Sequence, residues 1–210
     1  MATLRSGKYG VYYGSTQKKS EVLTETEQQA NALYIAVFLN AKGWSKNAVA
    51  AILGNMQAES SINPGRWQND DVGNTANGYG LVQWTPATKY IDWCSQNSYS
   101  DYSEMDSNLS RIIYEVENDI QWIGVGDYDD MTFSDFSTSN LTVSELAKAF
   151  LLCYERPADQ SDSVQSYRAT LAESWYSYLS GETPDQPGTT NTKKKSKYKF
   201  ILFKRRTFLG

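Results

Sequence analysis

A single carboxylate, Glu59, stands at the end of a segment with helical periodicity. Ser45 is a favourable N-cap residue for this segment. Apolar side chains then recur at helical spacing, at Val49, Ile52, Leu53 and Met56. Glu59 follows on the edge of the apolar stripe, where desolvation and the negative end of the helix dipole both raise the pKa of a carboxyl group. A raised pKa is what a general acid working near neutral pH requires.

The segment after Glu59 is rich in turns and aromatic side chains. Residues 64–78 are dense in Pro, Gly, Asn and Asp, which predicts turns. Residues 78–84, Gly-Tyr-Gly-Leu-Val-Gln-Trp, then combine aromatic rings, an amide and permissive glycines, a combination suited to a sugar-binding wall. We expect short strands near Trp67 and over residues 79–84, as the only sheet of the domain.

The composition excludes several classes of site. The chain has no histidine, which removes the usual zinc ligand and the usual base of serine and cysteine hydrolases. We therefore expect no metal and no cofactor. Cys94 and Cys153 both fall at apolar positions of predicted helices, so buried free thiols are favoured over a disulfide. The net charge of −4 argues against nucleic acid as a partner.

The remaining sequence predicts a mainly helical domain. Capping boxes at Thr24 with Glu27 and at Thr142 with Glu145 each predict a helix start. Thr85-Pro86 has the pattern of an N-cap followed by proline at the first helical position. The expected helices cover residues 24–41, 45–60, 85–97, 103–116, 142–157 and 163–180.

The two ends of the chain differ from the middle. Residues 1–20 lack periodicity and predict an arm, extended in part from Tyr9 to Tyr13, before a domain at 21–181. A Pro/Gly/Thr-rich linker is expected at 182–192, followed by a basic and apolar tail at 193–210 that is solvated or binds a partner or an anionic surface. There is no signal peptide pattern, and no apolar run approaches the ~20 residues of a membrane-spanning helix.

Four short motifs together resemble the phage tail-type lysozymes, the peptidoglycan-cutting domains at the tail tip of small podoviruses of Gram-positive hosts. The motifs are GNMQAES at 54–60, NPG at 63–65, GLVQWTP at 80–86 and YERP at 154–157. The resemblance covers roughly residues 27–180. It implies a lysozyme-like α+β fold: a helical bundle, a small β-hairpin and an active-site cleft.

The resemblance also implies roles for particular residues. Glu59 matches the catalytic acid of the family. Glycosidases commonly use a second carboxylate, for which Asp71 is preferred over Asp70, although both could simply form Asx turns. Gln83 would donate to an acetamido oxygen. The aromatic candidates for substrate contact are Tyr79, Trp84, Trp67 and Tyr154, although the first three are equally suited to the core. Glu155 and Arg156 are expected to pair with each other.

The function implied by the resemblance is peptidoglycan hydrolysis. The bond would be the β-1,4 link between N-acetylmuramic acid and N-acetylglucosamine, cut by a virion tail-tip component during entry through the host cell wall. Tail-knob proteins are a further expected partner, through residues 193–210. Two alternatives stay open: lytic transglycosylation of the same bond, and a non-catalytic glycan-binding or structural tail protein.

Overall fold

The computed structural model describes residues 2–15 and 20–181 of the 210-residue chain. The predicted linker at 182–192 and tail at 193–210 lie outside the described residues. In chain order the elements are β1 (Thr3–Gly7), β2 (Gly10–Gly14), α1 (Glu25–Ala41), α2 (Lys46–Ser60), η1 (Gln68–Asp70), α3 (Thr88–Gln96), α4 (Met105–Glu117), η2 (Gly126–Tyr128), α5 (Phe133–Thr138), α6 (Val143–Ala149), η3 (Phe150–Glu155) and α7 (Asp162–Ser180).

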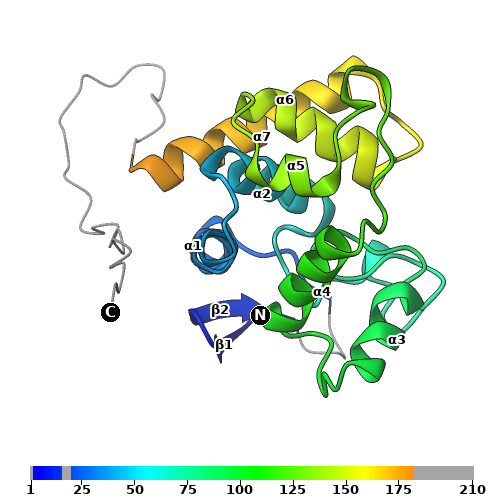
Figure 1. The fold of residues 1–210 in the computed structure, drawn as a ribbon. Helices are drawn as coiled ribbons and strands as arrows, with labels where there is room; N and C mark the ends of the chain where they lie inside the picture. Colours follow the sequence, from blue (N-terminus) through cyan, green and yellow to red (C-terminus); the bar gives the residue numbers. More distant parts are fainter. Residues whose placement is uncertain (1, 16–19, 182–210) are drawn as a thin grey trace, which may run out of the picture.

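The helices form two groups around α2. In Figure 1, α5, α6 and α7 pack with α2 in the upper part of the molecule, while α3 and α4 lie in the lower part with the turns that precede them. The hairpin β1–β2 lies beneath α1. This is a mainly α, lysozyme-like α+β fold with a small antiparallel hairpin, as the sequence predicts.

The central position of α2 follows from its sequence. Ser45 caps its first turn by accepting a hydrogen bond from the Ala48 amide at 3.1 Å. The residues from 48 to 56 are then buried on every side, which identifies α2 as a core helix and not an amphipathic surface helix. Residues 57–59, near the end of the helix, are partly exposed, and Glu59 is among them.

The helix starts predicted from capping boxes are confirmed, with both reciprocal hydrogen bonds present at Thr24 and at Thr142. The predicted start at Thr85 is wrong. The Thr85–Pro86 peptide bond is cis, the Thr85 hydroxyl donates to the Gln83 carbonyl at 2.9 Å, and α3 begins at Thr88. Thr85 therefore belongs to the turn before the helix.

The position of the sheet also differs from the prediction. Among the described residues, the regular hairpin is β1–β2, in the segment described above as an arm, with Leu4 opposite Tyr13. Tyr12 of this hairpin is 2% exposed and packs on Tyr34 of α1, so residues 3–14 are part of the fold. Near Trp67 and Tyr79 the structure has only isolated bridges, because the positive-φ turns there interrupt extended pairing.

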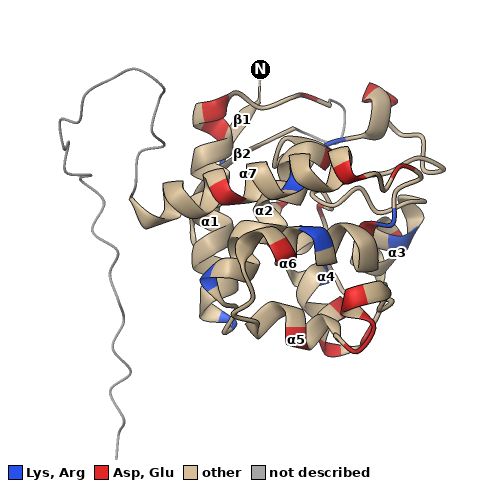
Figure 2. Ribbon diagram, turned by 90° about the horizontal axis from the view of Figure 1, so that it is seen from above, with Lys and Arg blue, Asp and Glu red and all other residues tan. Residues whose placement is uncertain are grey.

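Three further observations concern the described residues as a whole. Cys94 and Cys153 are buried free thiols, as expected. No helix within residues 2–15 and 20–181 combines the length and apolar character needed to cross a bilayer. Figure 2 shows the basic residues scattered over the ribbon among more numerous acidic ones.

Gly54 is the residue that lets α7 approach α2 closely. A Cβ atom placed on Gly54 would lie 2.5 Å from the backbone nitrogen of Ala172. Since a backbone atom cannot swing aside, Gly54→Ala should force α2 and α7 apart despite alanine's better helix propensity.

We expect Gly54→Ala to lower the free energy of unfolding by about 1–3 kcal/mol, measured by urea unfolding. Gly14→Ala is the matched control, because its added Cβ would meet Pro64 at an ordinary 3.4 Å. Equal stability of the two variants would contradict close packing at Gly54.

Candidate functional site

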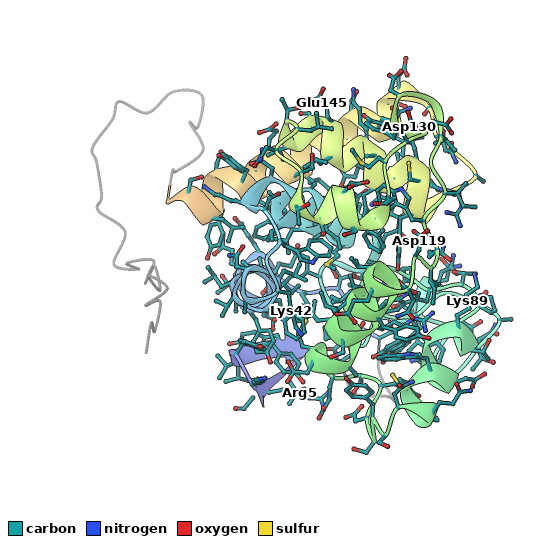
Figure 3. All side chains as sticks on the ribbon, in the orientation of Figure 1. Arg5, Lys42, Lys89, Asp119, Asp130 and Glu145 are labelled. Atoms are coloured by element: carbon teal, nitrogen blue, oxygen red, sulfur yellow. The ribbon has the colours of Figure 1, made fainter. Side chains whose placement is uncertain are left out.

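A hollow of about 450 Å³ lies beside the C-terminal end of α2. One wall is formed by Glu59 and residues 154–158, and the other by residues 82–85 with the start of α3. Figure 3 shows Lys89, which lines this hollow, on α3 in the lower group of helices. The hollow therefore lies where the two groups of helices meet.

The backbone at the end of α2 fixes the position of Glu59. Ser61 caps the helix in a left-handed conformation and donates its amide to the Gln57 carbonyl at 3.0 Å. Ser60 donates its hydroxyl to the Leu81 carbonyl at 2.8 Å, which joins the helix end to the opposite wall. The Glu59 side chain keeps 23% of its surface exposed, so it is accessible from the pocket without projecting into bulk solvent.

Arg168 of α7 contacts Glu59 from the protein side. Its Nη2 donates to Glu59 Oε1 in a short ion pair, and the same nitrogen lies 3.3 Å from Glu155 Oε2. Its Nη1 donates to the Asn55 carbonyl at 3.1 Å, which holds the guanidinium against α2. The single positive charge of Arg168 therefore interacts with two carboxyl groups.

Glu155 is the second carboxyl group of this cluster. It ends η3, a π-helical turn, and its side chain is only 4% exposed. Burial raises the pKa of Glu155 well above its usual value, and repulsion from Glu59 raises it further, while Arg168 opposes both effects. As a carboxylate, Glu155 would have no hydrogen-bond donor in good geometry among the described residues, whereas protonated Glu155 can donate to Glu59.

A second buried carboxylate, Glu115 of α4, joins the two walls of the pocket. It accepts from Arg111 Nε at 2.9 Å and from Trp84 Nε1 at 3.0 Å, and it forms a short hydrogen bond with the Tyr154 hydroxyl. Burial raises the pKa of Glu115, and these hydrogen bonds work against that rise. Trp84 and Tyr154 line the pocket but are only 4% and 2% exposed, and their polar atoms bond to Glu115, so substrate contact by these rings stays a prediction.

Gln83 also lines the pocket, but its donor group is already engaged. Its Nε2 donates to the carbonyls of Arg66 at 3.2 Å and Gly80 at 2.8 Å. Carbonyl oxygens only accept hydrogen bonds, so the Gln83 atom that faces them must be the donor Nε2 and not the acceptor Oε1. The two bonds therefore fix the orientation of the amide. The predicted donation to an acetamido oxygen does not fit this arrangement, and Oε1 is instead available as an acceptor.

Three predicted site residues lie elsewhere. Trp67 and Tyr79 are 1% and 0% exposed and pack edge to face with ring centres 4.5 Å apart. They offer no free face to a sugar, because their rings fill the core. Asp71 is exposed, does not line the pocket, and accepts from Asn74 Nδ2 at 2.7 Å and Asn77 Nδ2 at 3.1 Å. Both donors are side-chain amides and not backbone N–H groups, so these bonds hold Asp71 in the loop without forming the predicted Asx turn. Its neighbour Asp70 pairs with Arg66.

The expected pair between Glu155 and Arg156 is not formed. Arg156 Nη1 instead donates to the carbonyls of Gln121 and Cys153, and Glu155 faces Arg168. Sequence reasoning missed Arg168, although a signal was present. Arg168 falls at helical spacing between Val164 and Leu171, so a charged residue stands on an otherwise apolar stripe.

The fold and this site define a lysozyme-like helical domain with a pocket that holds two glutamates at the end of its central helix. The family model of the phage tail lysozymes matches residues 30–179, which is more than half of the chain. The chain belongs to this family, and the resemblance stated from the four motifs is confirmed.

A curated relative is Morphogenesis protein 1 of Bacillus phage B103. It is 49% identical over 164 residues, which cover 78% of this chain and 43% of the relative. The chain thus spans less than half the length of that protein. The relative's name is that of a phage morphogenesis protein, and the family is that of the phage tail lysozymes.

The buried position of Glu155 makes stability depend on pH. Protonated Glu155 contributes to the free energy of unfolding. This contribution is fully present below the unfolded-state pKa of 4.5 and is lost as the pH rises through the raised folded-state pKa. Glu155→Gln removes this loss. We therefore expect the variant to gain stability relative to the unmodified chain between about pH 4.5 and neutrality.

Urea unfolding at several pH values measures this difference. Glu173→Gln, at an exposed site on the same helix as Arg168, is the matched control and should leave the pH dependence unchanged. A stability difference between Glu155→Gln and the unmodified chain that does not vary with pH would argue against a buried, protonated Glu155.

Proposed function

We propose that this chain cleaves the β-1,4 bond between N-acetylmuramic acid and N-acetylglucosamine in bacterial peptidoglycan, with Glu59 as the general acid. The observation that carries the proposal is the position of Glu59 on the pocket wall, in a chain that belongs to the phage tail lysozymes. As a component of the virion tail, the protein would open the host cell wall during entry.

Glu59 would give its proton to the glycosidic oxygen as the bond to the sugar carbon breaks. The positive charge that develops on the sugar ring needs a partner on the other side of the bond. Glu155 is not placed for that role, because it contacts the same arginine nitrogen as Glu59 and its side chain is only 4% exposed. The prediction that Asp71 supplies this partner has no contact at the pocket to support it.

The substrate's own acetamido group would then serve as that partner, and Gln83 Oε1 could accept a hydrogen bond from its N–H. This arrangement also favours the second candidate reaction, lytic transglycosylation, in which the sugar's 6-hydroxyl replaces water as the attacking group. Association with tail-knob proteins through residues 193–210 stays a prediction.

We expect Glu59→Gln to reduce cleavage of purified Gram-positive cell walls by about 10²–10⁴-fold, the range supplied by a positioned acid. Mass spectrometry of the products reads both the rate and the chemistry: hydrolysis leaves reducing muramic ends, and transglycosylation leaves anhydro ends. Glu173→Gln is again the matched control. Binding to walls without new ends from the unmodified chain would favour a non-catalytic glycan-binding protein.

A further inference from the structure

The pocket contains two carboxyl groups but a single counter-charge that touches both. Arg168 Nη2 forms an ion pair with Glu59 and lies 3.3 Å from Glu155. The other charged group nearby is Arg156, in the turn that follows Glu155, and its Nη1 is directed at two backbone carbonyls. Lys89 lines the pocket from α3. Among the described residues, those that face Glu155 are therefore Glu59 from α2 and Arg168 from α7.

The charges in this cluster balance only when the pair holds one proton. With both carboxyl groups ionised, a buried negative charge remains uncompensated, which is costly at a side chain that is 4% exposed. With one proton, the remaining carboxylate and Arg168 neutralise each other. The unpartnered oxygens of Glu155 indicate where the proton resides, because a Glu155 hydroxyl gains an acceptor in Glu59.

We propose that Glu155 is a positioning residue that stores the proton which Glu59 delivers to the glycosidic oxygen. This inference rests on the proposed function. The O–H bond of Glu155 breaks as the proton moves to Glu59, and Glu59 passes it to the leaving oxygen as the glycosidic bond breaks. Arg168 contacts both groups, so the negative charge left on Glu155 keeps its counter-ion.

The attacking hydroxyl, from water or from the sugar, then loses its proton to the pair and restores the starting state. No oxidant, metal or co-reactant is required for this cycle. The raised pKa of Glu155 agrees with its role as the resting site of the proton. The alternative is that Glu155 only braces Arg168 and takes no part in proton transfer.

The test is the pH profile of kcat/KM for Glu155→Gln with a peptidoglycan fragment of defined length. In the variant, Glu155 no longer stores a proton for Glu59, so the cluster loses the group that retains its proton as the pH rises. We expect the alkaline limb of the variant to lie about one pH unit or more below that of the unmodified chain. At pH values above the alkaline limbs of both proteins, this shift corresponds to about a tenfold loss of kcat/KM. KM should change little, because the Glu155 side chain is only 4% exposed and offers little surface to the substrate. Glu155→Asp, which keeps a carboxyl group, should restore part of the rate.

Two results would overturn the inference. One is an alkaline limb in Glu155→Gln that coincides with that of the unmodified chain. The other is an equal loss of rate at every pH in Glu155→Gln and Glu155→Asp, which would show that Glu155 only holds Arg168 in place. Circular dichroism and thermal unfolding establish that both variants are folded. If the unmodified chain releases neither reducing nor anhydro ends, the proposed function fails as well, so the two failures are distinguishable.

Discussion

The guanidinium of Arg168 is a single cation placed between two carboxyl groups that come from different parts of the chain. Glu59 lies at the end of α2, Glu155 at the end of η3 and Arg168 in α7, so more than one hundred positions in sequence separate the first from the last. Burying a charge is unfavourable unless it is paired. The cluster therefore requires α2, η3 and α7 to meet at one point, and this requirement constrains the packing of the upper group of helices.

Small residues make that meeting possible. α2 carries alanine and glycine where α7 crosses it, and Gly54 brings its backbone against Ala172, one turn from Arg168. On the other side of the pocket, Glu115 holds Trp84 and Tyr154 in place by hydrogen bonds. Two buried carboxyl groups thus have different tasks: Glu115 joins the walls, whereas Glu155 lines the pocket beside the proposed acid.

Local sequence signals predicted the features that depend on local physics. The capping boxes at Thr24 and Thr142, and Ser45 as an N-cap, identified helix starts because the hydrogen bonds involved span only three residues. Glu59 was recognised from its motif and its place after an apolar stripe. The hairpin at residues 3–14 was missed, because its stability comes from packing on α1 and not from its own pattern.

The partners of Glu59 were not predictable in the same way. Arg168 and Glu155 reach it only after tertiary packing, and spacing along one helix says nothing about which charged residue faces another helix. Rings such as Trp67 and Tyr79 were equally suited by type to a core or to a sugar wall, and the fold placed them in the core. The charged residue on the apolar stripe of α7 was the one available warning of a buried ion pair.

The central claim is that the pair of Glu59 and Glu155 retains one proton well above pH 4.5. A carbon-13 NMR titration of the glutamate carboxyl groups tests it directly, with assignments from Glu59→Gln and Glu155→Gln. We expect the Glu155 carboxyl carbon to keep the chemical shift of a protonated acid well above pH 4.5, and to titrate at lower pH when Glu59→Gln removes the neighbouring charge. A Glu155 signal that titrates near 4.5 in both proteins would contradict the account.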